Sequence, residues 1–483
     1  MTYSSPSRRH FFFGSLLAGA VPTGGFGSTA SLRMMGYKSP NEKMNLAAIG
    51  SGGKGASDIA GCASENIVAL CDVDDKRAAR TFNLYEKAPK FKDFRQMLDK
   101  EGKNIDAVIV ATPDHMHATA TMWCMERGKH VYTQKPLTHT VWEARELTKA
   151  AAKYKVATQM GNQGYSNDGT RQCAEMIWAG EIGEVKEVHA WSNRPIWPQG
   201  LTEMPKTEPV PSNMDWQQWL GPAPDRPYSS AYAPFAWRGF FEFGCGALGD
   251  MACHILGAPN MALMLGSPAS VECVSQESKS EFMFPKKSVI RFDFPARANM
   301  PAVKIFWYDG CIDPPFRPEG LGKDEILGDL PRARPAAAPK PRPQPPPAAD
   351  SSSALDQMVN RLANVGSNGS LFVGDKGLIT TGTYGEGTRL LPASKMADYK
   401  FPAPLLTRSP GHYRDWIRAC KGGEQSCSNF SIAGPFTEWI LLGSLSLRFE
   451  GKLEWDSEKM RITNNREANE LLRPKFRKGW QFT

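Results

Sequence analysis

The sequence predicts an α/β protein in which a doubly wound parallel sheet is followed by an α+β domain with a large, mainly antiparallel open sheet. The 483 residues are enough for two or three domains with full cores. Between 44 and about 160, apolar runs alternate with helix-like stretches, which is the pattern of a parallel sheet covered by helices. Beyond that point, the runs 185–190, 288–294 and 303–308 alternate apolar and polar residues, as the strands of an antiparallel sheet do.

The first unit of the parallel sheet is built around a glycine loop. An apolar run at 45–49 leads into Gly50-Ser51-Gly52-Gly53-Lys54-Gly55, and a helix-compatible stretch and a second apolar run follow it. The first glycine permits a tight turn, Gly52 lets the backbone approach a pyrophosphate, and Gly55 allows close helix–strand packing. The N-terminus of the helix offers free N–H groups to the phosphates. We therefore predict a dinucleotide-binding Rossmann unit whose cofactor contacts include Gly50, Ser51, Gly52, Gly53 and Gly55.

Asp72 ends the second apolar run and points to the identity of the cofactor. Its distance from the loop is near the spacing of about 20 residues that is typical of a carboxylate accepting the ribose hydroxyls. A carboxylate there would repel the extra phosphate of NADP, so NAD is the expected cofactor. Arg77 lies close enough in the chain to weaken that preference, and NADP stays the less favoured alternative.

Two further strands bring polar residues to the same edge of the sheet. The buried run 105–112 ends at Pro113, and the short run 130–133 leads into Gln134-Lys135-Pro136. Ligands of such sheets bind at the carboxyl ends of the strands, and Pro136 keeps Lys135 extended, which favours a side chain that points into a cleft. Capping of the strand end is an equally good explanation for the two histidines here, and we expect His139 to be structural. The expected cofactor contacts are Thr112, Pro113, His115, His117, Gln134 and Lys135.

The alternation of strands and helices ends near residue 160, where we place a domain boundary. Gly161-Asn162-Gln163-Gly164 breaks the pattern, so the cofactor domain is expected at 41–160, a substrate-binding domain at 161–405, and a helical segment with a tail at 406–483. The loop 191–241 is rich in Trp, Pro and Arg. Most of its aromatic residues are expected to pack in the core, and one or two could form a platform for a sugar ring. The stretch 371–381 is typical of a hairpin, and 412–421 and 436–447 are typical of helices.

The composition excludes several classes of function. The formal charge of +8 equals the charge of eight basic residues in two acid-free stretches, which leaves the rest of the chain without the basic surface that nucleic acid needs. The ten cysteines show no CxxC and no ligand-like Cys/His pair, so neither a metal site nor a disulfide framework is predicted. Cys420 with Cys427, or Cys245 with Cys253, could pair, but buried free thiols are the simpler interpretation. The eight basic residues are Arg8, Arg9, Arg33, Lys38, Arg332, Arg334, Lys340 and Arg342.

Two segments are expected to lie outside the folded domains. Residues 1–40 are interpreted as an export signal and linker, because Arg8-Arg9 precedes a short apolar core and resembles the twin-arginine motif. A periplasmic or other extracytoplasmic location follows from that interpretation. The apolar core is too short for a permanent membrane span. Residues 331–350 are nearly all Pro, Ala, Arg and Lys and are expected to form a disordered insertion.

Lys135, Asp250 and His254 could carry redox chemistry. Asp250 and His254 are four residues apart, so a helix would place both side chains on one face. Oxidation of a secondary alcohol needs a base for the hydroxyl proton, and a histidine oriented by a carboxylate fits that role. An ammonium beside the carbinol oxygen would stabilise the developing alkoxide. Without further context, a helix cap or a buried hydrogen bond is the simpler explanation of the Asp–His pair.

The order of these motifs resembles that of the glucose–fructose oxidoreductase/inositol dehydrogenase family, also called Gfo/Idh/MocA. The resemblance covers about residues 44–460 and includes the glycine loop, Asp72, Thr112-Pro113-Asp114-His115-Met116-His117, Gln134-Lys135-Pro136 and the Asp250–His254 pair. With the twin-arginine leader, it is strongest to exported long-chain bacterial members. It implies catalysis by Lys135, Asp250 and His254, and association of copies through the open face of the second sheet. Gln134 departs from the commoner Glu-Lys-Pro motif, which removes a charge beside the lysine.

The resemblance implies a carbohydrate or polyol as substrate and allows three functions. The residues expected to contact the substrate are Gln163, Asn193, Arg194, Trp237 and Arg238. The first function is NAD-dependent oxidation of a secondary alcohol. Because little free NAD is expected outside the cytoplasm, the alternative is a redox-neutral glycosidase or lyase that retains its NAD and acts through a transient ketone. The third is a sugar- or nucleotide-binding module without catalysis.

Overall fold

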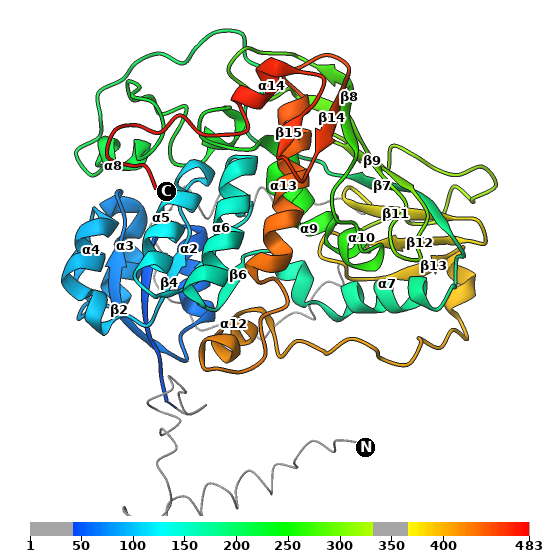
Figure 1. Cartoon of the computed structure of the whole chain (residues 1–483), viewed down its shortest axis with the longest axis horizontal. Coiled ribbons are helices and arrows are strands. Elements are labelled where there is room, and N and C mark those ends of the chain that lie inside the picture. The colour runs from blue at the N-terminus through cyan, green and yellow to red at the C-terminus, as the bar shows by residue number, and fades with distance from the viewer. Residues whose placement is uncertain (1–41, 332–365, 483) are drawn as a thin grey trace, which may run out of the picture. The chain divides into compact units, whose positions relative to one another are not determined.

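The computed structural model describes residues 42–331 and 366–482 (Figure 1). The predicted export signal at 1–40 and the Pro-rich insertion from residue 332 onward lie outside these ranges. Inside them, no helix joins enough length to enough apolar character to traverse a bilayer. The same ranges contain no group of three or more His, Cys, Asp or Glu side chains that could hold a metal ion. All ten cysteines are free thiols.

Six parallel strands form the N-terminal sheet, in the order β3-β2-β1-β4-β5-β6. They are β1 (Asn45–Ile49), β2 (Asn66–Cys71), β3 (Lys90–Phe91), β4 (Ala107–Val110), β5 (His130–Thr133) and β6 (Thr158–Met160). The helices of this domain are α2 (Lys54–Gly61), α3 (Asp75–Leu84), α4 (Phe94–Glu101), α5 (Asp114–Glu126) and α6 (Val141–Tyr154). The strand order reverses between β1 and β4, which is where doubly wound sheets bind their ligands. The predicted parallel sheet is confirmed.

Local sequence explains where these elements begin. β4 reads Ala-Val-Ile-Val and is buried throughout, as a strand covered by helices on both faces should be. Helix α6 begins after Thr140, whose hydroxyl accepts from the Glu143 backbone N–H while the Glu143 carboxylate accepts from the Thr140 N–H. Asp74 caps α3 by accepting from the Arg77 N–H. Because the strands are parallel, the turns that lead from each strand into the following helix lie at the same edge of the sheet.

The second sheet has nine strands in the order β13-β12-β11-β7-β10-β9-β8-β14-β15. β7 (Val185–Trp191) and β10 (Val303–Tyr308) pair in parallel, and the other pairs are antiparallel. Along β9 (Lys287–Phe294), buried residues alternate with half-buried ones, so one face is packed and the other is partly open. The predicted, mainly antiparallel sheet is confirmed. Its other strands are β8 (Ser270–Glu277), β11 (Gly369–Gly374), β12 (Leu378–Thr381), β13 (Arg389–Leu391), β14 (Lys452–Asp456) and β15 (Arg461–Ile462).

Helix α13 (Phe430–Ser446) joins the two domains. It packs against α6 of the first domain and against α9 (Gly246–Ile255), β8 and β9 of the second (Figure 1). Its Trp439 meets Phe292 and Phe294 edge to face in the core. The helix begins earlier than the predicted start at residue 436, because Asn429 caps it by accepting from the Ser431 N–H. The remaining helices are α7 (Asp168–Trp178), α8 (Trp216–Leu220), α10 (Gly257–Ala262), α12 (His412–Cys420) and α14 (Arg466–Glu470).

Candidate active site

A cavity of about 1120 Å³ lies at the carboxyl edge of the parallel sheet. Its wall is formed by the glycine loop, the ends of β2, β4 and β5, one face of α9, residues of the loop 191–241, and the start of α12. The three predicted catalytic residues, Lys135, Asp250 and His254, all line it. Small-molecule sites usually enclose about 300–1,000 Å³, so this cavity has room for a dinucleotide and a second ligand.

The glycine loop has the backbone geometry that its sequence predicts. Gly50 has a positive φ of 85°, and a Cβ on it would lie 2.4 Å from the Ala111 carbonyl oxygen. A Cβ on Gly55 would lie 1.9 Å from the Gly50 carbonyl oxygen, so only glycine allows α2 to pack this closely on the turn. The N-terminus of α2 has no side-chain cap. It therefore leaves backbone N–H groups for the phosphates of a dinucleotide.

Asp72 supports the loop from the end of β2. Its Oδ2 accepts from the N–H groups of Ser51 (2.8 Å) and Gly52 (2.9 Å), and its Oδ1 accepts from the Asp74 N–H (2.9 Å). Burial raises the pKa of this carboxyl, although the three N–H donors oppose the shift. Asp72 also lines the cavity, so its predicted contact with the ribose hydroxyls stays a prediction beside this observed role.

Arg77 lies across the glycine loop from the first turn of α3. A Cβ on Gly53 would lie 2.4 Å from its guanidinium, and a Cβ on Gly52 would lie 2.7 Å from its backbone carbonyl. The absence of side chains at both glycines thus lets α3 approach the loop, in addition to the predicted approach of a pyrophosphate. Because Arg77 lines the cavity, its positive charge is available to a phosphate of the cofactor.

Lys135, Asp250 and Arg238 form one ion-pair cluster. Lys135 Nζ donates to the Asp250 carboxylate (2.7 Å) and to the Asp250 carbonyl (2.8 Å), and Arg238 Nε donates to the same carboxylate (3.3 Å). Burial would raise the pKa of Asp250, but the two cations outweigh it and hold the pKa well below its usual range. Asp250 is therefore ionised, and its charge is directed at the lysine and the arginine.

His254 lies one helical turn after Asp250 on α9, as the spacing predicts. Burial, and then the charge of Lys135, lower the pKa of the imidazole well below its usual value. Its Nδ1 is buried and has no hydrogen-bond partner within the part of the chain that the structure describes. Tyr384 meets the ring edge to face, with centroids 4.8 Å apart. The imidazole is therefore neutral, and the expected orientation of His254 by a direct bond to Asp250 is not found among the described residues.

Gln134 is held by a carboxylate that sequence reasoning missed. Its Nε2 donates to Asp58 Oδ2 (2.8 Å), and its Oε1 accepts from the Lys135 backbone N–H (3.3 Å). Asp58 is fully buried on α2 and also binds Lys54 Nζ and the Tyr413 hydroxyl (2.7 Å). A polar residue four positions after Lys54 is an ordinary feature of a helix, so the sequence carried no signal for this contact.

The two histidines that follow Pro113 face backbone carbonyls. His115 lies between the carbonyls of Phe243 and Trp219, and His117 lies between those of Pro136 and Thr112. Burial lowers the pKa of His115 to about 3 and that of His117 to about 4. These contacts match the capping alternative, whereas Thr112 and Pro113 themselves line the cavity. His139 lies between two further carbonyls, in agreement with the expected structural role.

The predicted substrate contacts divide into two groups. Gln163, Arg194, Trp237 and Arg238 line the cavity. Asn193 is not among the lining residues, and it is bound to the residues just before β11: its backbone N–H donates to Asn368 Oδ1 (3.1 Å) and its side-chain amide donates to the Ser367 hydroxyl (3.3 Å). The face of Trp237 is covered by the Arg238 guanidinium at 4.2 Å, and Phe235 and Trp197 lie 4.5 and 5.8 Å from the same group. These rings therefore stack on an arginine, where the sequence suggested a platform for a sugar.

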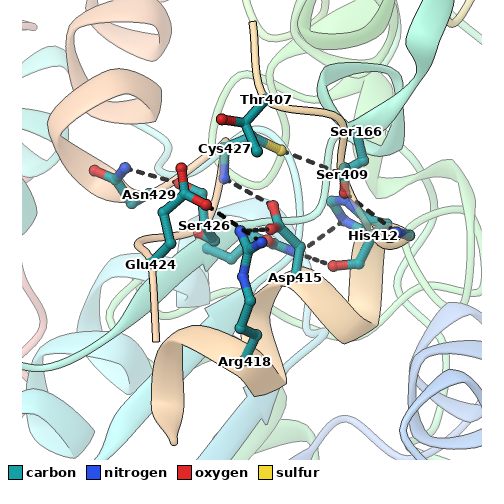
Figure 2. A network of polar contacts seen from close by, with 12 residues as sticks. Ser166, Thr407, Ser409, His412, Asp415, Arg418, Glu424, Ser426, Cys427 and Asn429 are labelled. Atoms are coloured by element: carbon teal, nitrogen blue, oxygen red, sulfur yellow. Dashed lines mark hydrogen bonds and ion pairs between the residues drawn. The ribbon is translucent and has the colours of Figure 1, made fainter. Parts of the chain in front are cut away.

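Helix α12 closes the cavity from the C-terminal segment and was not predicted to do so. His412 lines the cavity, with its Nδ1 2.8 Å from the Ser166 hydroxyl and its Nε2 3.1 Å from the Tyr132 hydroxyl. Figure 2 shows how Asp415 fixes the helix by accepting from the Cys427 N–H and from Arg418. Since His412 lies 246 residues from Ser166 and 280 residues from Tyr132, no local sequence pattern predicts these contacts.

Comparisons with known proteins identify the two halves of this arrangement. The family model described as "Oxidoreductase family, NAD-binding Rossmann fold" matches residues 44–162, and the model for the C-terminal alpha/beta domain of the same family matches residues 181–287. Inositol 2-dehydrogenase of Serratia proteamaculans is 27% identical over 183 residues, which are 37% of this chain and 54% of that protein. A glycosyl hydrolase family 109 protein of Solibacter usitatus is 25% identical over 176 residues, or 33% of this chain and 39% of that protein.

The fold also occurs in solved structures. The WlbA dehydrogenase of Bordetella pertussis, solved with NADH and UDP-GlcNAcA, aligns with a TM-score of 0.55 at 15% identity over 86% of this chain and 99% of that one. At this identity, the likeness concerns the fold. Against the curated relatives named above, the chain spans about half of their length or less. The two family models match in chain order around one cavity, so the chain carries the NAD-binding Rossmann domain and the C-terminal alpha/beta domain of the Gfo/Idh/MocA oxidoreductases.

Proposed function

We propose that this protein oxidises a secondary alcohol of a sugar, polyol or glycoside. NAD, when bound at the glycine loop, would supply the hydride acceptor. The observation that supports the proposal is that a lysine ammonium and a neutral imidazole line the same cavity as the loop. An electrophile and a base beside a dinucleotide site are what alcohol oxidation requires.

Lys135 is assigned to the substrate oxygen. An ammonium has three N–H donors, and the two bonds to Asp250 leave one for a developing alkoxide. The Asp250 carboxylate would hold the ammonium in place, since it binds the lysine directly. We therefore assign Asp250 to the positioning of Lys135, with an effect on His254 through charge alone.

His254 is assigned to the hydroxyl proton. A neutral imidazole can take a proton, and burial, followed by the charge of Lys135, lowers the pKa of His254 and so keeps the ring neutral before the reaction. One side of the imidazole is closed to water, because its Nδ1 is buried and Tyr384 packs against the ring. After proton transfer, the new imidazolium would lie within the field of Asp250, which stabilises it.

Replacement of either residue tests this assignment. NADH formation would be followed by absorbance during a screen of sugars and polyols with the wild type, and the best substrate would then be given to Lys135→Met and His254→Ala. Each variant should lose about 100-fold or more in kcat/KM. Arg414→Gln, which removes an exposed charge from α12, should leave kcat/KM unchanged. Wild-type turnover by Lys135→Met would contradict the role assigned to this lysine, and no NADH formation by the wild type with any tested compound would favour the non-catalytic binding module.

The alternative, a redox-neutral glycosidase or lyase with retained NAD, is favoured by one observation. Residues 213–221, which we call the clasp, include α8 and are bound to the turn after β2. The Asp215 N–H donates to the Val73 carbonyl (2.9 Å), and the Asp75 N–H donates to the Asn213 carbonyl (3.0 Å). The Asn213 side chain also donates to Asp74 Oδ1 (2.7 Å). Because the ribose next to adenine binds at the end of β2 in such folds, the clasp would hinder release of a dinucleotide.

Export would make such retention useful. We propose, from Arg8-Arg9, that the chain leaves the cytoplasm by the twin-arginine route, where released NAD could not be recovered. Native mass spectrometry of the purified protein measures retained dinucleotide, and nitrophenyl glycosides offered without added NAD measure cleavage. Near-stoichiometric NAD together with cleavage would support the redox-neutral function. Stoichiometric NADH formation from added NAD would support net oxidation.

A further inference from the structure

The part of the cavity wall around Lys135, Asp250 and His254, which we call the catalytic half, carries more positive than negative charge. Lys135 and Arg238 share one carboxylate, Asp250. Asp329, on the same part of the wall, is bound by the Thr383 N–H (2.7 Å), the Thr383 hydroxyl (2.9 Å) and the Asn368 amide (3.3 Å). Asp114 also lines the cavity and accepts from the Cys245 N–H (3.1 Å), and burial raises its pKa to about 7 although the charges of Arg238 and Lys135 oppose the shift. All three carboxylates are thus already bound by donors of the protein.

Arg194 is the cation of the catalytic half that forms no ion pair with a carboxylate of the described residues. Its guanidinium donates to the Asn193 amide oxygen, and it forms no ion pair with any residue of the ranges 42–331 and 366–482. It is half-buried and lines the cavity. Its charge lies close enough to the catalytic cluster to help lower the pKa of Asp250.

Arg238, in contrast, is already held by contacts within the protein. It is bound to Asp250, donates to the Phe235 carbonyl (3.1 Å), and lies against three aromatic rings. Aromatic faces and a carboxylate together hold a guanidinium in one place. The remaining arginine without an ion pair on the described wall, Arg77, lies at the glycine loop, where the phosphates of the cofactor are expected. Arg194 is therefore the arginine available to the second ligand.

We propose that the substrate carries a carboxylate that Arg194 binds, so that the substrate class is a uronic acid, a sugar acid or a glycoside of one. The fork of a guanidinium presents two parallel N–H groups to a planar carboxylate. A neutral sugar would leave this half-buried charge without a counter-ion. The inference rests on the proposed function, because it names the substrate of the same site. A phosphate would also attract the arginine, but it matches a planar fork less well than a carboxylate does.

Paired ligands that differ in one group test the proposal. The NADH-loaded protein would be titrated calorimetrically with D-glucuronate and D-glucose, D-galacturonate and D-galactose, and D-gluconate and D-sorbitol, with D-glucose 6-phosphate as the phosphate ligand. At least one acid should bind about 10-fold or more tightly than its neutral partner, and more tightly than the phosphate. Added salt should weaken the binding of that acid more than that of the neutral sugar.

Variants assign the preference to one side chain. Arg194→Gln should reduce the affinity for the favoured acid about 10- to 100-fold and change that of the neutral partner less than about 3-fold. Arg194→Lys should recover part of the loss, since it keeps the charge without the fork. Arg414→Gln removes an equal charge from the exposed face of α12 and should change neither the affinity for the acid nor that for its neutral partner.

The outcomes separate this inference from the proposed function. If no acid binds more tightly than its neutral partner, if the phosphate binds best, or if Arg194→Gln loses both ligands equally, the carboxylate proposal is wrong. Acids that bind through Arg194 but are never oxidised or cleaved would contradict the proposed function and leave the carboxylate site standing. Oxidation of neutral sugars alone would support the proposed function and contradict the carboxylate proposal.

Discussion

At the scale of single residues, Gln134 and Asp58 behave as a matched pair. The Gln134 amide binds the buried Asp58 carboxylate with one end and the Lys135 backbone with the other. A glutamate at 134, which is the residue of the commoner motif, would place a second carboxylate about where Gln134 Nε2 now lies, 2.8 Å from Asp58 Oδ2. Two carboxylates at such a distance cannot both stay ionised. In this chain the carboxylate beside position 134 belongs to α2, where Lys54 and Tyr413 also bind it.

We predict that a carboxylate at position 134 is tolerated only if the carboxylate at position 58 is removed. In Gln134→Glu, one of the two carboxyls should keep its proton in the folded state, because its pKa is raised by the other. Such a group is protonated in the fold but ionised in the unfolded chain above pH 4 or so, so the stability that it contributes is lost as pH rises through the raised pKa. The melting temperature of Gln134→Glu should therefore lie several degrees further below that of the wild type at pH 8 than at pH 5.

The double variant Asp58→Asn/Gln134→Glu supplies the control. It has one carboxylate, and its melting temperature should follow that of the wild type at both pH values. A loss in Gln134→Glu that is the same at pH 5 and pH 8 would mean that shape is responsible and charge is not. Failure of the double variant to recover would separate the two positions.

The same residues show how far sequence reasoning reaches. Gly50 and Gly55 were predictable because their roles are local, and Lys135 because a proline follows a strand end. Asp250 and His254 were placed on one helical face by their spacing. The partners of these groups were not predictable, since Asp250 meets Lys135 across 115 residues and Asp58 meets Tyr413 across 355. Side-chain contacts at such separations depend on the packing of whole domains, which no local pattern encodes.

At the scale of elements, the clasp joins parts of the chain that are distant in sequence. The tail residue Arg477 donates to the Gly221 carbonyl (2.8 Å), to the Gln217 carbonyl (2.6 Å) and to the Gln217 side chain (2.6 Å). His115 Nε2 lies 3.0 Å from the Trp219 carbonyl. These bonds satisfy carbonyls at the C-terminal end of α8, a helix of only five residues that could not persist alone. The composition of the long aromatic loop allowed a prediction of core packing and of a platform for a sugar ring, whereas its attachment to the turn after β2 and to the tail was not predictable.

Loosening the clasp is predicted to speed release of the cofactor. Arg477→Ala removes three bonds to the clasp and touches neither Lys135 nor His254. The rate of NADH release, followed by stopped-flow fluorescence, should rise about 10-fold, since each lost bond to a charged group is worth about 1.5–3 kcal/mol and part of that is recovered by water.

The matched control comes from the same tail. Arg473→Ala removes an arginine that stacks on Trp142, 4.6 Å away, and forms none of the clasp contacts named above. It should leave the rate of NADH release unchanged. Equal rates in Arg477→Ala and the wild type would show that the clasp does not limit release, and the redox-neutral function would lose its support.

At the scale of the whole molecule, the two domains are one packed body. α13 inserts its Trp439 into the core of the second sheet while it packs on α6 of the first domain, and β14 of the C-terminal segment pairs with β8. The cavity takes its wall from both domains. Binding of a dinucleotide should therefore stabilise both domains as a unit, and not the Rossmann domain alone.

Scanning calorimetry tests this coupling. The protein, freed of any bound dinucleotide, should unfold in one transition, and saturating NADH should move the whole transition upward. At a concentration 100 times Kd, a ligand that binds only the folded state adds about 2.7 kcal/mol to the free energy of unfolding, which corresponds to a shift of a few degrees for a chain of this size. NADPH should give a smaller shift if Asp72 faces the ribose as predicted, because the carboxylate repels the additional phosphate. Two resolved transitions, with NADH moving one of them, would mean that the domains unfold independently and that α13 does not couple them. Equal shifts with NADH and NADPH would instead point to Arg77 as the residue that meets the 2′-phosphate.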